Sequence, residues 1–307
     1  NVFYVLETLR YLFDQGLLRV EAGAWHTPVD SFTSDYRELS LPPSVRDALL
    51  EGLQRLGEGV LPILQALALA DFPLPPDMAA GLLRHLGAPI TELESLTQSG
   101  FLRLDLAGYS LRHELVRQSV LAEMGESRRR WLHARIADTL REVAGPLPLL
   151  AAHLEAAGQR AEAYVAHLMA GRSLRRGPLA RQALEHYQRA QVLCTPMEPD
   201  PERFRMLIEA AETRVRLGQL QIPERQEMAR LADNLGEHER FRLLMLNADA
   251  ALASGRVAKG IQAAREAQQL AQTPWQRGHA LFKLAWLEYR GATPMCSSSP
   301  SWPPSRP

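Results

Sequence analysis

One compact group of polar residues lies where the pattern of the chain changes from strand to helix. Arg112, His113 and Glu114 follow an alternating apolar run and precede a run with helical spacing. The N-terminus of a helix carries partial positive charge, so an imidazole there, next to a guanidinium, is a plausible donor to an anion such as phosphate. The alternative is that the preceding turn satisfies the His113 ring. Both hypotheses stand for this residue.

The segments next to this group predict a hairpin and a helix. Residues 101–106 and 109–111 have the composition of two strands, and the segment 105–108 between them predicts a turn. Residues 115–121 then carry apolar side chains at helical spacing.

Helical patterns precede the predicted hairpin in four segments: 44–56, 60–70, 76–86 and 91–99. The segment 60–70 is almost wholly apolar, so we expect a buried central helix there. Thr91 and Glu94 have the spacing of a capping box. Short helices followed by a two-stranded wing are the order of a winged-helix domain.

The remainder of the chain is predicted to be helical almost to its end. Ser127 predicts the start of a helix that ends at Gly145. Eight further segments follow at short intervals: 147–157, 160–173, 178–193, 201–217, 223–235, 238–254, 257–271 and 273–289. The distance from Gly218 to Gly255 is close to a repeat of ~34 residues. The pattern therefore favours a degenerate solenoid of helix pairs.

Composition excludes several classes of protein. The 307 residues contain 35 basic and 35 acidic side chains, a balance unlike that of a nucleic-acid-binding surface. No apolar run approaches the ~20 residues of a membrane span, so we expect no membrane contact. Cys194 and Cys296 leave room for one disulfide at most, which favours a cytoplasmic protein.

Motifs for catalysis and metal binding are missing from the sequence. The only lysines are Lys259 and Lys283, and neither lies in a phosphate-binding loop of the G-x-x-x-x-G-K-[ST] type. The histidines and cysteines lack zinc spacing, and no nucleophile motif occurs. We therefore expect no enzyme activity and no cofactor in this chain.

The predicted winged helix is also a poor candidate for a DNA reader. Its second helix-turn-helix element, residues 91–99, carries Glu92 and Glu94 and no Lys or Arg. Carboxylates facing phosphates would repel them, and the wing supplies only Arg103 and Arg112. We expect no direct DNA binding by this part.

Two other groups of side chains are interpreted structurally. The triplet 128–130, three arginines, is expected on a solvated helix face. Five aromatic residues have solenoid packing spacing and are expected in the core rather than at a ligand: Tyr164, Tyr187, Phe204, Phe241 and Trp286.

Five segments, in order, resemble those of bacterial STAND-class signalling ATPases, which include LuxR-type transcriptional regulators. Asn1-Val-Phe-Tyr-Val-Leu-Glu7 is similar to their Asn-Pro-Phe-Phe-Leu-Leu-Glu motif. Leu41–Arg46 with Leu53–Leu56 is similar to their linker and first helix. Tyr109–Arg117 resembles their Phe-x-Phe-x-His-x-Leu-x-Arg-Glu segment. Two shorter matches are Arg129–His133 and Ala151–Gly158. The resemblance covers residues 1–289.

The resemblance implies a mainly α protein with three parts: a remnant of the ATPase lid and linker (1–40), a winged-helix domain and following helix (41–145), and tetratricopeptide-like helical repeats (146–291). The composition of residues 292–307, rich in Ser and Pro, separately predicts a disordered tail. A P-loop ATPase module would precede the lid and would be the partner in cis. The repeats would bind a protein or small-molecule effector.

The resemblance also implies roles for single residues. His113, with Arg112 beside it, would sense the β-phosphate of ADP held by the missing module, so ATP or ADP is expected only with that module. Val2 stands where the family has a proline that packs at the nucleotide. The implied function is the regulatory coupling and sensor region of a nucleotide-switched regulator. The rival hypothesis is a helical-repeat scaffold for protein partners with no nucleotide role.

Overall fold

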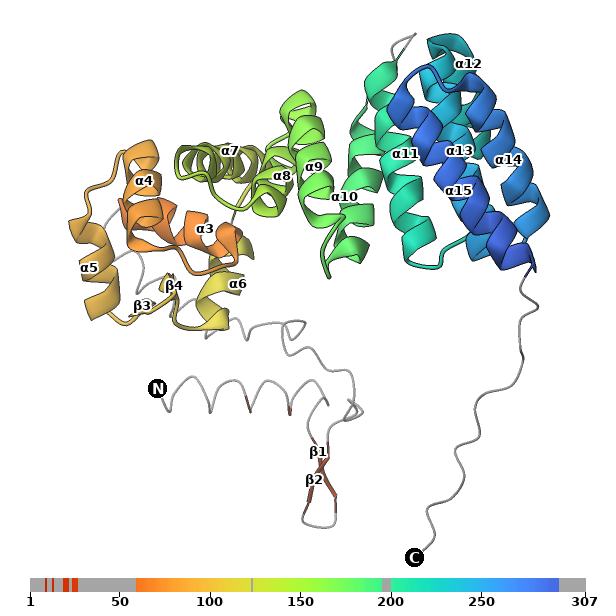
Figure 1. The fold of residues 1–307 in the computed structure, drawn as a ribbon. Coiled ribbons are helices and arrows are strands. Elements are labelled where there is room, and N and C mark those ends of the chain that lie inside the picture. Colours follow the sequence, from red (N-terminus) through yellow and green to blue (C-terminus); the bar gives the residue numbers. More distant parts are fainter. Residues whose placement is uncertain are drawn as a thin grey trace, which may run out of the picture. The chain divides into compact units, whose positions relative to one another are not determined.

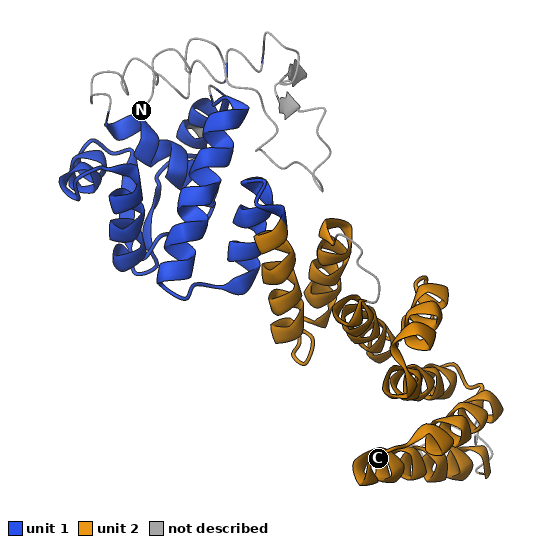
Figure 2. Ribbon diagram, turned by 90° about the horizontal axis from the view of Figure 1, so that it is seen from above, with its two compact units in different colours: residues 1–160 blue, residues 161–307 orange. Residues whose placement is uncertain are grey.

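The computed structural model describes residues 59–122, 124–194 and 200–292, together with residues 9, 13, 19–21 and 24–26. This part of the chain is mainly α-helical, with 13 helices and two antiparallel two-stranded hairpins (Figure 1). It divides into two compact units, residues 1–160 and 161–307 (Figure 2). The helix 44–56, Val2, Cys296 and the tail from 293 lie outside the described residues, as does most of the predicted lid remnant.

The first unit contains both hairpins and the helices up to α8. Near the N-terminus, β1 (Arg19–Glu21) pairs with β2 (Ala24–His26). The remaining elements are α3 (Val60–Ala70), α4 (Pro76–Leu86), α5 (Thr91–Gln98), β3 (Leu102–Asp105), β4 (Gly108–Leu111), α6 (Glu114–Ala122), α7 (Glu126–Glu142) and α8 (Leu147–Ala156). Helix α8 lies in this unit and packs on α7, although the predicted helical array begins at residue 146.

Helix α3 is the centre of the first unit. It packs against α4, α6, α7 and β4, and Ile63 and Leu64 are completely buried. A helix that is apolar on nearly every side must be covered on every side, which confirms the prediction of a buried central helix. It ends at Asp71, whose φ of 58° is left-handed.

Helix α5 begins differently from the prediction. Thr91 is already its first helical residue, Ile90 before it has helical angles, and no side-chain capping bond forms. The backbone N–H groups of Glu92 and Leu93 instead donate to the carbonyls of Pro89 and Ile90. The predicted capping box was therefore wrong, because a tight backbone turn supplies the bonds. Ser127 makes no capping bond either, since α7 follows Gly125.

The predicted hairpin forms and is attached to the loop after α3. Leu102 pairs with Leu111, and Arg103 with Ser110. Tyr109 exchanges two backbone hydrogen bonds of 2.8 Å with Leu74. Gly108 makes this approach possible: its φ is 125°, and a Cβ there would lie 2.1 Å from the Leu74 carbonyl oxygen.

The second unit consists of helices joined by short connections. They are α9 (Arg160–Leu174), α10 (Ala180–Leu193), α11 (Pro201–Arg216), α12 (Arg225–Leu235), α13 (Glu237–Ala253), α14 (Val257–Leu270) and α15 (Pro274–Ala292). Each corresponds to a helical segment predicted from periodicity. No described helix is long and apolar enough to cross a membrane.

The predicted core aromatic residues divide into two groups. Tyr187, Phe204 and Phe241 are buried, as expected, and Tyr164 is partly buried. Trp286 is 44% exposed, so its assignment to the core was wrong. It lies on a side of α15 that no described helix covers.

Candidate functional site

His113 lies at the junction predicted from the sequence, after β4 and before α6. The backbone N–H of Arg112 donates to the Phe101 carbonyl at 2.9 Å, which extends the pairing of the hairpin by one residue. The His113 carbonyl accepts from the Val116 N–H at 3.1 Å. The exposed His113 ring is therefore held between a paired strand and a helix start.

A cleft of about 190 Å³ opens beside His113, within the first unit. Its polar lining consists of Asp71, Arg103, Ser110, His113, Glu114 and Arg117. Pockets that enclose small molecules typically measure ~300–1,000 Å³. The cleft is thus too small to enclose a nucleotide, but it has room for a group of the size of a phosphate.

The two guanidinium groups in the cleft already have protein partners. Arg117 donates to the Ala68 carbonyl at 3.0 Å and forms ion pairs with Asp71 and Glu114 at 3.3 and 3.4 Å. An anion that entered would compete with these carboxylates.

Across the cleft, Arg103 donates to the Ser110 hydroxyl at 2.9 Å and lies 3.7 Å from Asp105. The site therefore combines cationic and anionic groups, unlike a strongly basic anion pocket.

The structure brings together only part of the predicted site. His113 lines the cleft, whereas the Arg112 guanidinium lies beside Gly100 and outside the lining. Arg103 and Arg117 take its place. Both could have been found from sequence: the hairpin register places Arg103 opposite Ser110, and Arg117 follows His113 by four residues on one helix face.

A pair of histidines connects α7 and α8 in the same unit. The Nδ1 atoms of His133 and His153 are 2.8 Å apart, so one ring donates to the other. Burial, and then the neighbouring His133, lowers the pKa of His153 to about 4. Burial, and then Arg129, lowers the pKa of His133. Both rings are therefore neutral near pH 7, and the pair forms a structural contact.

A similar pair occurs in the second unit, where the Nδ1 atoms of His167 and His186 are 2.9 Å apart. No group of three or more potential metal ligands occurs among the described residues. The two histidine pairs are accounted for by hydrogen bonding between their rings.

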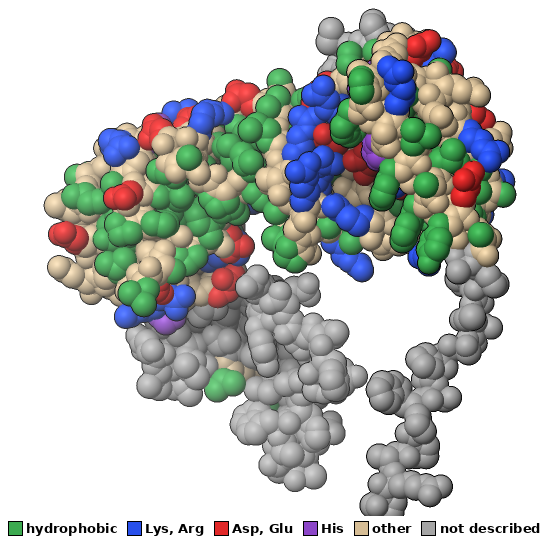
Figure 3. Space-filling model, in the orientation of Figure 1, with side chains coloured by type: hydrophobic (Ala, Val, Ile, Leu, Met, Phe, Trp, Pro, Cys, Tyr) green, Lys and Arg blue, Asp and Glu red, His purple; other side chains and the backbone are tan. Residues whose placement is uncertain are grey.

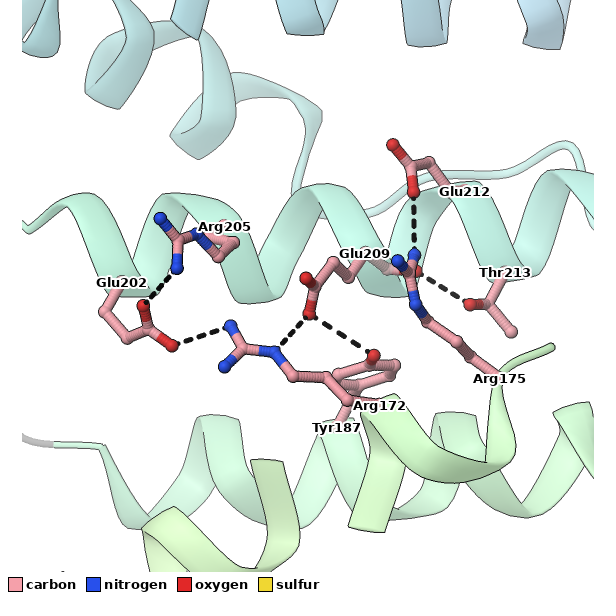
Figure 4. A network of polar contacts seen from close by, with 8 residues as sticks. All are labelled: Arg172, Arg175, Tyr187, Glu202, Arg205, Glu209, Glu212 and Thr213. Carbon is pink, nitrogen blue, oxygen red and sulfur yellow. Dashed lines mark hydrogen bonds and ion pairs between the residues drawn. The ribbon is translucent and has the colours of Figure 1, made fainter. Parts of the chain in front are cut away.

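The second unit contains a partly buried network of polar contacts between α9, α10 and α11 (Figure 4). Arg172 on α9 reaches across to Glu209 at 2.9 Å and to Glu202 at 2.7 Å. The buried Tyr187 hydroxyl donates to Glu209 at 3.4 Å. Burial, and then Glu209, raises the pKa of Tyr187 well above its usual value, so the phenol keeps its proton.

A second buried pair joins α11 to the residue before α12. Arg214 contacts both carboxylate oxygens of Glu224, at 2.6 and 3.0 Å, and both side chains are almost fully buried. Two parallel bonds of this kind fix orientation as well as distance. These contacts position helices, and they hold no open cavity.

Charged side chains on the visible surface are mixed in sign. Figure 3 shows arginines gathered on the face of the second unit around α9 and α10, with acidic side chains next to them. Arg175, for example, is paired with Glu212 at 3.0 Å. The described surface in this view offers no large field of one sign.

Comparisons with protein-family models, with curated proteins and with solved structures find no match for this chain. The residues of the cleft and the arrangement of the helices are therefore the basis for the function proposed below.

Proposed function

We propose that this chain is the regulatory coupling and sensor region of a nucleotide-switched signalling or transcription regulator. In this proposal a winged-helix domain carries His113 to a nucleotide that a separate P-loop ATPase module holds. A tetratricopeptide-like array of helix pairs receives the signal. The chain itself has no ATPase activity and binds ATP or ADP only with that module.

The order of elements in the first unit supports the winged-helix part. Helices α3, α4 and α5 precede the hairpin β3–β4, and the hairpin leads directly into α6. The first turn of α5 carries Glu92 and Glu94, which supports a coupling role rather than contact with DNA phosphates.

A common register of three helices supports the repeat part. A separation of 37 residues relates Phe204 on α11 to Phe241 on α13, and Gly218 to Gly255 after those helices. Both glycines have positive φ, 75° and 71°, and end their helices in the same way. In α15 the phenylalanine and the glycine are not repeated, but Leu281 follows Leu244 of α13 by the same 37 residues. Helix pairs that repeat with one period stack into a solenoid.

The observation that carries the nucleotide role is the position of His113 at a cleft of phosphate size. A cleft of about 190 Å³ fits one edge of a nucleotide whose remainder is held elsewhere. The exposed ring, at the start of α6, can donate an N–H to an oxygen of that edge. Arg103 and Arg117 lie beside it.

The switch follows from differential binding. Nucleotide on the ATPase module stabilises the docked winged helix through the His113 contact. An effector that binds the repeats better in the undocked state shifts the balance, and the nucleotide then changes effector affinity by the same factor.

The test is a His113→Ala substitution in the protein that includes the upstream ATPase module. We expect ADP to be released about tenfold faster, which corresponds to about 1.4 kcal/mol of lost contact. His85→Ala is the matched control, because His85 lies in the same unit on α4 and pairs with Glu142 away from the cleft. Unchanged ADP retention in His113→Ala would overturn the sensor role.

The second candidate is a helical-repeat scaffold that binds a protein partner and has no nucleotide role. The uncovered aromatic side of α15 favours it. If His113→Ala and His85→Ala retain ADP equally well while a partner still binds the repeats, the scaffold is the better description.

A further inference from the structure

Helix α15 carries a row of exposed apolar side chains on one side. The row, called here the α15 stripe, consists of Trp275, Leu281, Phe282, Ala285, Trp286 and Tyr289. Trp275 and Phe282 are 70% and 69% exposed, and Tyr289 is 62% exposed. Large aromatic residues that lie together on one helix face indicate a binding surface rather than chance exposure.

The 37-residue register identifies what this side does in the preceding helix. Leu281 and Phe282 correspond to Leu244 and Met245 of α13, and Tyr289 corresponds to Leu252. In α13 these positions pack in clusters with residues of α14, among them Ala267 and Ile261, and with residues of α15. Leu281, Phe282 and Tyr289 therefore lie on the side of the helix that α14 covers in the earlier pair. Trp275 and Trp286 correspond to His238 and Asp249, which contact α15 in the earlier pair.

The opposite side of α15 obeys the same register. Ala280 and Leu287 of α15 are completely buried. They correspond to Leu243 and Ala250 of α13. Leu243 and Ala250 pack in the core that α11 and α12 share with α13. Helix α15 thus packs against the helices before it through the same side that α13 uses.

The rim of the α15 stripe is basic. Arg277 and Arg290 lie at its two edges, both exposed, and Arg290 stacks on Trp286 with its guanidinium carbon 5.7 Å from the ring centre. Glu288 is the acidic residue on this rim, and Arg265 pairs with it at 3.1 Å. A complementary partner carries carboxylates on either side of an apolar face.

We propose that the α15 stripe binds an amphipathic helix of a partner protein, with aspartate and glutamate bordering its apolar face. The partner helix takes the place on α15 that α14 takes on α13. This inference rests on the helix-pair repeats of the proposed function and is independent of nucleotide sensing.

A second copy of the chain fits this surface less well. In an antiparallel pair of α15 helices, related by two-fold symmetry, Arg277 of one copy would face Arg290 of the other. Two like charges at both ends of the contact oppose the association.

The experiment measures binding of two labelled synthetic peptides to the full chain by fluorescence polarisation. Both peptides carry the apolar positions of α14, Val257–Leu270, and are held helical by a side-chain lactam. One has glutamates along the rim and the other has lysines. We expect the glutamate peptide to bind at least about tenfold more tightly than the lysine peptide.

Two substitutions locate the contact. Phe282→Glu should abolish binding, because it places a charge in the middle of the α15 stripe. Val165→Glu is the matched control, since Val165 is 51% exposed on α9, and should bind normally. The double reversal Arg277→Glu with Arg290→Glu should exchange the preference between the two peptides.

Three results would overturn the proposal. The first is equal affinity for the two peptides, and the second is no binding of either. The third is self-association of the chain that Phe282→Glu abolishes, because a second copy would then be the occupant. None of these results depends on ADP, so the His113 test and this one can fail separately.

Discussion

The two units stabilise their helices in different ways. The first is organised around one apolar helix, α3, and its neighbours come from distant parts of the chain, as far as Leu140 on α7. In the second, contacts run mainly between helices that are close in sequence, and arginine–glutamate pairs that are partly or almost fully buried join them. The difference predicts where each unit is vulnerable: the first to steric changes and the second to loss of a charge partner.

The largest expected effect is steric and falls on the first unit. Gly108→Val would place a β-branched side chain at φ 125° and against the Leu74 carbonyl, which breaks the two backbone bonds between Leu74 and Tyr109. We expect a loss of about 4 kcal/mol from the combined strain and lost bonds. Urea unfolding gives the size of the loss, and hydrogen exchange of peptides from each unit locates it.

Gly125→Val is the matched control, because no atom would contact a Cβ at position 125 and its φ is not positive. A loss confined to residues 161–292 in Gly108→Val would contradict the division of roles between the units.

The next effect concerns charge and falls on the second unit. Arg214→Ala leaves Glu224 buried without its two-bond partner, and we expect a loss of about 3 kcal/mol in the free energy of unfolding. Arg205→Ala removes a pair with Glu202 at 3.5 Å on an exposed side chain and should cost less than about 1 kcal/mol. Equal losses for the two variants would show that burial of the pair is unimportant.

The smallest effect is a dependence of the first unit on pH. Burial lowers the pKa of His153 from its ordinary 6.5 to about 4 in the folded state, so the unfolded chain binds the proton first as pH falls. Stability is then full above pH 6.5 and declines between pH 6.5 and 4.

From pH 7.5 to 5 the expected loss is about 2 kcal/mol. His153→Phe should reduce this slope, as measured by urea unfolding at several pH values. A slope identical to that of the unmodified chain would assign the pH dependence to other groups, such as His133, whose pKa burial also lowers.

Periodicity was sufficient to predict the helices, because each must bury one side. The segment 60–70 matches α3 at both ends, since an uninterrupted apolar run between Gly59 and Asp71 leaves little choice. Pro76 begins α4 and Gly87 ends it for equally local reasons. Capping was harder to predict. The Thr91 side chain was expected to accept a hydrogen bond from the first turn of α5, but the backbone carbonyls of Pro89 and Ile90 accept the bonds of that turn instead.

The candidate site was predictable only in part. His113 was identified from its position between a strand and a helix. Arg117 could have been placed beside His113 by helix spacing, but its contact with Asp71 could not, because the two meet only when α6 packs on α3. Trp286 was misassigned for a related reason, because spacing shows which side of a helix is apolar but cannot show whether another helix covers it.

The central position of α3 also constrains the order in which the chain can fold. The residues that cover it lie on α4, on the hairpin and on α6 and α7, so its apolar surface stays exposed until Leu132 to Leu140 are available. Closing such long loops slows folding, whereas the helices from α11 to α14 mainly contact helices one or two places away in the chain. During synthesis, the segment 60–70 therefore needs protection from aggregation for longer than any helix of the second unit. In stopped-flow refolding followed by hydrogen exchange, the backbone amides of α13 and α14 should become protected before those of α3.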